Sequence, residues 1–404
     1  MPRKKLRIEN YLTHLPVRML LLAFGSICSF SNVQADASGT IVFTQRFDGV
    51  PAIVVEVGWS YVRATPSLTF GPSRTIWTGA GVTEGTAGSD GLFYTPSGDL
   101  MVANWETSPN PNRFWKFDPF KTDVVVEGPS EGAFGFHMLL HPNEEDFLAT
   151  PALGGIACSD GSGPRGCFGA YDHTPLTTTQ LCLAPKESAT QDILQPVSFI
   201  ADENLNMFAL FNEGVDVEFG GAGFASFDLD TTTSTACSNS MTMTRLIPVG
   251  LEAGHSMSWD PFLSDANDGG DPHSDFIIFA DSKVSQIRVD DPGTPGAGAA
   301  LVSTVDMATE AVCDSLLPAG LHEFDQGAVN GEGIALVGDE QNGYLALIDY
   351  SQNTNGQLLD GVNTVCLTAY LSDGIDDIAP LTGLGARPGG ASFIFKDSFE
   401  GEDK

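Results

Sequence analysis

A recurring unit of polar corner, short strand, tight turn and second strand constrains this chain more than any other feature. Its clearest copy is residues 88–104. Residues 92–95 and 100–103 have the composition of two strands, and Pro96-Ser97-Gly98-Asp99 between them has the composition of a type I turn. The small and polar residues 89–91 stand just before the first strand. This pattern predicts a β-hairpin that opens a larger repeated unit.

Similar units recur at intervals of roughly 45–65 residues, which is the spacing of propeller blades with long loops. The 45 glycines and 24 prolines separate short runs rich in Val, Ile, Phe, Leu and Thr. Helical periodicity is scarce after residue 40. We therefore predict an all-β chain folded as a β-propeller, while two packed sheets in a β-sandwich are the structural alternative because short strands with regular turns also suit that fold.

The order of the units suggests how the ring closes. Units begin near residues 40, 92, 135, 196, 254 and 326. Residues 373–381 resemble the start of one more blade with nothing after them, and the N-terminal strands within residues 40–57 would complete it. Pairing of C-terminal with N-terminal strands removes exposed sheet edges. This count predicts six blades, or seven if residues 59–78 form a unit of their own.

The N-terminus has the features of an export signal. Five basic residues (Arg3, Lys4, Lys5, Arg7 and Arg18) precede an apolar stretch from residue 19 to 30. Small residues allow cleavage after Ala35 or Ala37, and the apolar stretch is too short to span a bilayer. We expect residues 1–35 to be a signal peptide, residues 36–387 the propeller and residues 388–404 a C-terminal tail. The protein is then periplasmic, on the outer surface or secreted, with membrane contact only if the signal stays uncleaved.

The charge balance excludes some partners. Loss of residues 1–35 would leave 14 basic and 51 acidic residues, a net charge of −37 compared with −33 for the whole chain. Such a surface repels nucleic acid and anionic membranes. The acidic residues are scattered, as on a solvated surface, and divalent-cation binding is the sharper alternative. We expect a monomer that binds an unidentified ligand or protein partner.

Six cysteines remain after the signal: Cys158, Cys167, Cys182, Cys237, Cys313 and Cys366. An even number in an exported chain favours disulfides. A Cys158–Cys167 bond would close a glycine-rich loop, and Cys313–Cys366 is the next most plausible pair. No pair has the CxxC spacing of a zinc site.

Polar residues at the blade corners form the candidate site. In a propeller, the residues just before the innermost strands approach the axis together. These corners carry Asp90, His137, His255, His322-Glu323, Asp325 and Asp376-Asp377. Imidazoles and carboxylates aimed at one axis can bind a divalent cation or act as acid and base. We take Asp90, His137 and Asp376 as candidate metal ligands. A single corner Asp more commonly caps a turn.

An acidic loop offers a second candidate metal site. Asp265, Asn267 and Asp271 follow the alternate spacing of a calcium loop, with Gly270 at the sharp turn. The bidentate Glu that should close such a loop is replaced by Phe276. A solvated acidic insertion is the simpler interpretation. The chain has no Gly-x-Ser-x-Gly elbow, HExxH motif or phosphate-binding loop.

The motif Gly135-Phe136-His137 before an apolar strand, together with residues 88–104, resembles the repeat of six-bladed propellers of the streptogramin-lyase, NHL-repeat and gluconolactonase-like group. The resemblance covers residues 88–345. It implies either a binding propeller or a metal-dependent lyase or lactonase in which a His and a Glu act beside magnesium. His255 or His322, with Glu323 or Glu332, match those roles. Calcium or magnesium is the only cofactor implied.

The last residues resemble a short tail found on exported proteins of some Gram-negative bacteria. The match is the aromatic stretch 393–395 followed by Asp397-Ser398-Phe399-Glu400. It implies handling at the cell envelope, whereas a frayed terminus is the simpler interpretation. The favoured function is an exported propeller that binds a ligand or partner on a polar His/Asp axial face. The alternative is a metal-dependent lyase or lactonase that uses His255, His322 and Glu323.

Overall fold

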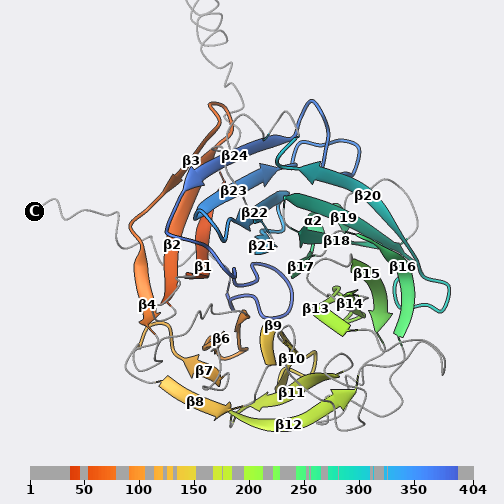
Figure 1. Cartoon of the computed structure of the whole chain (residues 1–404). Coiled ribbons are helices and arrows are strands. Elements are labelled where there is room, and N and C mark those ends of the chain that lie inside the picture. Colours follow the sequence, from red (N-terminus) through yellow and green to blue (C-terminus); the bar gives the residue numbers. More distant parts are fainter. Residues whose placement is uncertain are drawn as a thin grey trace, which may run out of the picture.

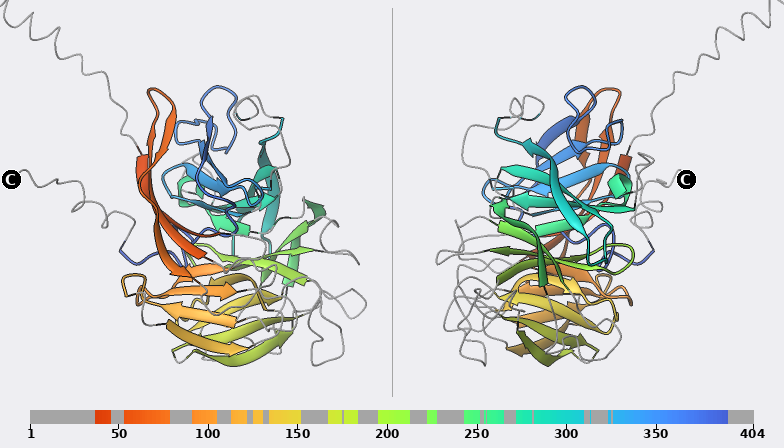
Figure 2. Two further views of the ribbon diagram at one scale, coloured as in Figure 1. Left: turned by 60° about the vertical axis from the view of Figure 1, so that its left-hand side comes forward. Right: turned by 90° about the vertical axis from the view of Figure 1, so that its right-hand side faces the viewer.

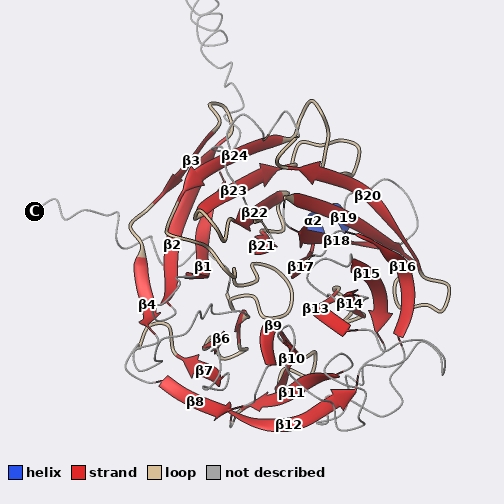
Figure 3. Ribbon diagram, viewed as in Figure 1, coloured by secondary structure: helices blue, strands red, loops and turns tan. Residues whose placement is uncertain are grey.

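The structure is a computed structural model of the whole chain. It describes residues 37–45, 53–78, 91–104, 113–121, 125–130, 134–151, 167–174, 176–183, 195–212, 222–227, 243–251, 254, 256–264, 272–280, 282–309, 313, 323–324 and 326–389. Within these ranges strands dominate, and the one short helix is α2 (Pro261–Ser264) (Figure 3). None of the described helices is long and apolar enough to cross a membrane.

Six antiparallel sheets stand around a common axis, as the blades of a propeller (Figure 1). Blade 1 contains β1 (Ala37–Gln45), β2 (Ile53–Val62), β3 (Ser67–Phe70) and β4 (Arg74–Thr78). Blade 2 contains β5 (Leu92–Tyr94), β6 (Leu100–Asn104), β7 (Arg113–Phe117) and β8 (Val125–Ser130), and blade 3 contains β9 (Phe134–Leu140), β10 (Asp146–Pro151), β11 (Cys167–His173) and β12 (Leu176–Leu183). Blade 4 contains β13 (Gln195–Ala201), β14 (Met207–Asn212), β15 (Ala222–Phe227) and β16 (Met243–Leu251). Blade 5 contains β17 (Ser256–Trp259), β18 (His273–Ala280), β19 (Lys283–Asp290) and β20 (Gly298–Asp306), and blade 6 contains β21 (Gln326–Val329), β22 (Ile334–Gly338), β23 (Tyr344–Asp349) and β24 (Val365–Tyr370).

Residues 376–379 close the ring by pairing with β1. The amides of Asp376 and Ala379 donate to the carbonyls of Thr44 and Val42, both over 2.9 Å, and Phe43 bridges Ile378. The predicted closure by the two chain ends is therefore confirmed. Because β3 and β4 both pair with β2, residues 59–78 belong to blade 1. The seventh blade and the β-sandwich are wrong.

Apolar side chains hold neighbouring blades together. Among the described residues, six buried clusters lie one at each blade interface. Strand β10 shows how the alternation of side chains serves both interfaces. Phe147 and Ala149 pack towards blade 2, whereas Leu148 packs towards blade 4. Successive side chains of a strand point to opposite faces, so strands buried on both faces appear in the sequence as continuous apolar runs.

The turn that follows each innermost strand is a repeated polar structure. Its first residue is Thr95, His141, Asp202, Asp260 or Asn330 in blades 2 to 6. In blades 3 to 6 the side chain of this residue accepts a hydrogen bond from the backbone N–H two residues later. Such bonds satisfy amides that the turn would leave unpaired. The polar residues that follow the innermost strands in the sequence therefore serve largely to cap turns.

The fourth residue of this turn has a left-handed backbone in four blades. These residues are Gly98 (φ 87°), Glu144 (φ 61°), Leu205 (φ 63°) and Gly333 (φ 85°). A left-handed backbone is routine for glycine and costs other residues about 1–2 kcal/mol. The glycines of blades 2 and 6 therefore adopt this backbone without strain, whereas Glu144 of blade 3 and Leu205 of blade 4 are strained.

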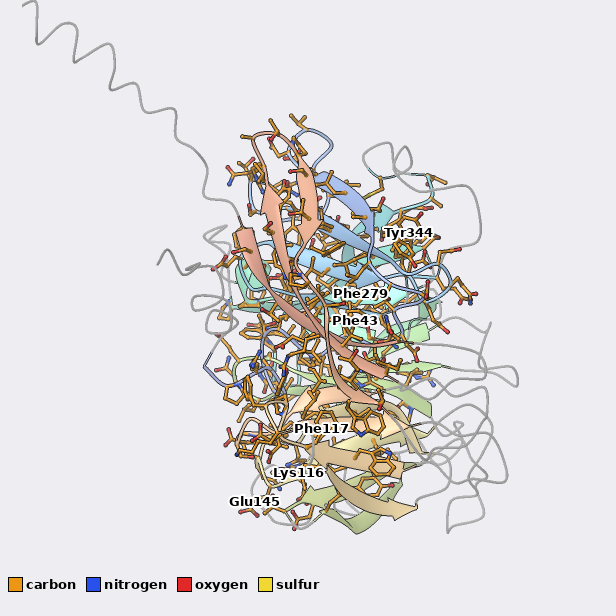
Figure 4. All side chains as sticks on the ribbon, turned by 90° about the vertical axis from the view of Figure 1, so that its left-hand side faces the viewer. Phe43, Lys116, Phe117, Glu145, Phe279 and Tyr344 are labelled. Atoms are coloured by element: carbon orange, nitrogen blue, oxygen red, sulfur yellow. A yellow bond between two sulfur atoms is a disulfide. The ribbon has the colours of Figure 1, made fainter. Side chains whose placement is uncertain are left out.

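The ring has two distinct faces. We call the end that carries the turns after the innermost strands the turn face. Strand β1 begins on this face, and the described C-terminal segment ends on it (Figure 2). Glu145, on such a turn, and Tyr344, at the start of β23, lie towards opposite faces, with Phe43 and Phe279 among the strands between them (Figure 4). The other end, where the innermost strands begin, we call the entry face.

A disulfide joins Cys313 to Cys366 of β24, which confirms one of the predicted pairs. The bond ties the segment before β21 to the outermost strand of the same blade, and Cys313 is fully buried in the cluster between blades 5 and 6. Cys158 and the side chain of Cys167 lie outside the described residues. Their pairing stays a prediction.

Candidate functional site

At one equivalent position of the innermost strands, five of the six blades carry a polar residue. In each of blades 2 to 6, this position lies four residues before the first residue of the turn that follows the innermost strand. In blade 1, where Pro380 corresponds to that first turn residue, it lies four residues before Pro380. These positions hold Gly91, His137, Ser198, Ser256, Gln326 and Asp376. We call the five polar members, His137, Ser198, Ser256, Gln326 and Asp376, the polar ring. Contacts between the neighbouring innermost strands β9, β13, β17 and β21 support this equivalence.

His137 and Ser198 meet directly across the interface of blades 3 and 4. The distance from His137 Nε2 to Ser198 Oγ is 3.2 Å. The backbone N–H of His137 donates to Thr150 Oγ1 over 3.0 Å. Ser198 is fully buried, so its hydroxyl serves to orient the imidazole. The Nδ1 atom is also buried and has no hydrogen-bond partner among the described residues.

Burial governs the charge of this imidazole. It lowers the pKa of His137 to about 4 from the usual 6.5, because a charged ring would lose its hydration. His137 is therefore neutral at pH 7. One nitrogen of a neutral imidazole carries a lone pair that can accept a hydrogen bond or bind a cation.

The remaining ring members are buried polar groups of complementary kinds. Ser256 Oγ accepts from the N–H of Gly327 in the next blade over 3.2 Å. The Oε1 atom of Gln326 accepts no hydrogen bond from the part of the chain that is described. Asp376 contributes a buried carboxylate next to the closing contact with Thr44. The ring therefore offers mainly acceptor atoms.

Two of the sequence-predicted residues, His137 and Asp376, occupy this equivalent position in blades 3 and 1. His137 lies inside β9, not at the corner before it as the sequence suggested, because β9 begins at Phe134. Glu323 is described at the entry face, where its carboxylate accepts from Gln341 Nε2 and its backbone N–H donates to Asp339 Oδ1. These contacts fix Glu323 to the turn between β22 and β23.

The other predicted site residues lie outside the described part of the chain: Asp90, His255, His322, Asp265, Asn267 and Asp271. The position expected to close the calcium loop holds Phe276, which is buried between Phe208 and Phe224. Within the described ranges, no three His, Cys, Asp or Glu side chains gather so that they could hold a metal ion.

Sequence reasoning missed Ser198, Ser256 and Gln326. Each is an uncharged residue inside or at the start of an apolar strand, so none stands out by type. The signal that finds them is positional. The corners that the sequence analysis inspected, among them Asp90, His255 and Asp325, stand one residue before these positions in the sequence. Counting back from the turns separates the two sets, and inspecting the corners alone does not.

Comparison with known proteins finds distant structural neighbours and no family. No family model and no curated protein matches the chain. Among solved structures, a calcium-binding protein, regucalcin, from Agrobacterium tumefaciens is similar at 10% identity and a TM-score of 0.42, covering 66% of this chain and 72% of that one. A hypothetical selenium-binding protein from Sulfolobus tokodaii has 10% identity and a TM-score of 0.40, with 74% and 71% covered. A PQQ-bound aldose sugar dehydrogenase from Streptomyces coelicolor has 11% identity and a TM-score of 0.38, with 83% and 98% covered.

Proposed function

We propose that this protein is a binding propeller that takes a ligand or partner group at the polar ring. The observation that carries the proposal is the equivalent position of the five polar residues on five innermost strands. These residues lie far apart in the sequence and occupy equivalent positions around the ring, and sites shared between structural units are common places for ligands to bind. The first turn residues at the turn face are also polar, but in blades 3 to 6 their side chains accept hydrogen bonds from their own turns.

The chemistry of the ring selects the class of ligand. The lone pair of neutral His137, the amide oxygen of Gln326 and the carboxylate of Asp376 all accept hydrogen bonds or positive charge. The chain as a whole carries a net charge of −33. We therefore expect a ligand that donates hydrogen bonds or carries positive charge, such as a divalent cation, an organic amine or a polyol.

Ligand-induced stabilisation tests the proposal on the purified full chain. Thermal melts would be recorded with calcium chloride, magnesium chloride, 1,4-diaminobutane and sorbitol. A probe at one hundred times its Kd should stabilise the fold by about 2.7 kcal/mol. Gln326→Leu and Asp376→Asn should remove the shift of the melting temperature. Gln352→Leu is the matched control, because Gln352 is exposed in the loop before β24.

The ring is not the site if a probe stabilises native protein and both ring variants equally. A response to calcium or magnesium alone would identify the ligand as a divalent cation. A response to the amine or the polyol alone would identify an organic ligand and leave no role for a cation.

A metal-dependent lyase or lactonase is the second candidate function. The resemblance of the sequence to the streptogramin-lyase, NHL-repeat and gluconolactonase-like group supports it, together with Glu323, whose carboxylate lies at the entry face and accepts from Gln341. His255, His322 and Glu323 would carry the reaction. Hydrolysis of a δ-lactone by the native protein with added magnesium or calcium, lost in His255→Ala and His322→Ala, would support it. No turnover with either ion would remove this candidate.

Export belongs to the same proposal. The basic and apolar stretches of residues 1–35 support it, and so does the Cys313–Cys366 disulfide, because disulfides persist in oxidising compartments. N-terminal sequencing of the protein recovered outside the cytoplasm tests it. A mature chain that starts near Ala37 is expected, and an intact Met1 on a protein confined to the cytoplasm would contradict it.

A further inference from the structure

The C-terminal segment Pro380–Arg387 crosses the axis at the turn face. In blade 1 the chain does not turn back into the next strand, because that strand is the N-terminal β1. The chain instead continues across the centre of the ring (Figure 1). We call residues 380–387 the strap. Its contacts concern the turn face and are separate from the polar ring.

The strap touches blades all around the ring. The hydroxyl of Thr382 donates to the carbonyl of Trp259 in blade 5 over 3.1 Å. Leu384 packs against the two clusters that join blades 2 and 3 and blades 3 and 4. The carbonyl of Gly385 accepts from the N–H of Tyr94 in blade 2 over 2.7 Å. Side-chain and backbone contacts therefore connect the strap to blades 2 to 5, and blades 2 and 5 are not neighbours in the ring.

Glycine is needed where the strap meets blade 2. Gly385 has a φ of 80°, and a Cβ there would lie 3.0 Å from the Cβ of Phe93. Only a residue without a side chain lets the backbone approach this closely in that conformation. The strap is thus fitted to the ring and is not a loose continuation of the chain.

Arg387 anchors the outer end of the strap in blade 1. Its Nη1 donates to Glu56 Oε1 over 3.0 Å, and Glu56 is buried. The guanidinium also lies over the rings of Phe120 and Tyr94, at 5.2 and 5.7 Å from their centroids. The second oxygen of Glu56 accepts from Arg74 Nε over 2.9 Å. A buried carboxylate that holds two arginines fixes the place at which the described chain leaves the ring.

The closing segment pairs with β1 over a shorter stretch than β2 does. Residues 376–379 and β1 share three backbone hydrogen bonds in blade 1, whereas β1 and β2 are paired over nine residues. A short terminal strand opens more readily than the core it joins. Without the strap, a force applied to the residues after 387 would act directly on the hydrogen bonds between residues 376–379 and β1.

We infer that the strap is a lock on the ring closure. While the ion pair between Arg387 and Glu56 is intact, residues 376–379 cannot separate from β1, whether by thermal motion or by a pull on the C-terminal residues. The strap also covers the turn face. A partner that takes hold of the C-terminal residues must displace Arg387 before it can open the ring.

Hydrogen exchange of the full chain tests the lock. Arg387→Met removes the ion pair and keeps an apolar stem of similar length. We expect the amides of Thr44, Asp376 and Ala379 to exchange about tenfold faster, because their opening no longer requires breaking the anchor. Amides of β22 and β23 should be unchanged. Arg245→Met is the matched control, since Arg245 also lies over an aromatic ring, that of Phe211, but is away from the strap.

Two truncations make the test sharper. A chain that ends at Gly389 keeps the strap and should exchange like the native protein, whereas a chain that ends at Ala379 lacks it and should exchange faster than Arg387→Met. If the shorter chain fails to fold, the exchange rates of Arg387→Met alone test the lock. An unchanged rate at Thr44, Asp376 and Ala379 in Arg387→Met, or an equal acceleration of β22 and β23, would overturn the lock.

Discussion

Tyr350 and Asp260 share a hydrogen bond between blades 5 and 6, in which the tyrosine hydroxyl donates to Asp260 Oδ2 over 2.5 Å. Both residues are fully buried. The other oxygen of Asp260 caps helix α2 by accepting from the N–H groups of Phe262 and Leu263. The pair therefore links the turn of one blade to the residue that follows the third strand of the next.

Tyr350→Phe should destabilise the protein by about 1–3 kcal/mol, because Asp260 Oδ2 would stay buried without its donor. Chemical denaturation at pH 8 measures this. Tyr370→Phe is the matched control, since Tyr370 donates to Asp373 at the surface, and its effect should stay below about 0.5 kcal/mol. Equal effects of the two variants would contradict the importance of burial.

The same pair predicts a dependence on pH. Burial raises the pKa of Asp260 to about 6 from 3.8, although hydrogen bonds from Tyr350 and the helix lower it. A raised pKa means that the folded state binds the proton more tightly, so this contribution to stability is full below about pH 4 and lost as pH rises through 6. The loss caused by Tyr350→Phe should therefore be smaller at pH 5 than at pH 8. A loss independent of pH would contradict the assignment.

His137 should act in the opposite direction. Its pKa is lowered to about 4 from 6.5 by burial, so the folded state binds the proton less tightly than the unfolded state. Stability from the neutral ring is present above pH 6.5 and falls by about 3 kcal/mol as pH drops to 4. His137→Gln should remove this loss. Denaturation of both proteins at pH 7, 5 and 4 isolates the effect, since Asp260 is common to both, and parallel profiles would refute it.

The left-handed turn residues predict a stabilising substitution. Leu205 has a φ of 63° and is exposed. Leu205→Gly relieves about 1–2 kcal/mol of backbone strain and costs about 0.5–1 kcal/mol in chain entropy, so a net gain of about 0.5–1 kcal/mol is expected. The reverse change, Gly98→Leu, should destabilise, because Gly98 has a φ of 87° and open space around it. Thermal melts compare the two, and a stabilising Gly98→Leu would contradict the argument.

The disulfide predicts a large loss on removal. Cys313 and Cys366 are 53 residues apart, and closing a loop of that length restricts the unfolded chain by about 4 kcal/mol. Cys313→Ala combined with Cys366→Ala should lower the free energy of unfolding by that order in urea denaturation. Each single variant should lose about as much as the pair. A double variant as stable as the native protein would show that the bond contributes nothing.

The amino-acid sequence by itself determined the strands, their turns and the way the ring closes. These features depend on local patterns: apolar runs that pack on two faces, as Phe147 and Leu148 do, and polar residues such as Asp202 and Asn330 that cap turns. The incomplete unit at residues 373–381 and the unmatched strands near residue 40 predicted the closure. The even number of cysteines predicted disulfides, with Cys313–Cys366 as one of two plausible pairs, and the structure contains that bond.

Only the tertiary structure decided which residues of the innermost strands occupy equivalent positions. Ser198, Ser256 and Gln326 are unremarkable in sequence, and they share an equivalent position with His137 and Asp376 because each innermost strand ends at the same turn. Only the structure shows that Ser198 contacts His137. The strap was equally hidden. Thr382, Leu384 and Arg387 show no pattern along the chain, and they acquire their partners in blades 5, 3 and 1 only when closure of the ring brings those blades to the same face.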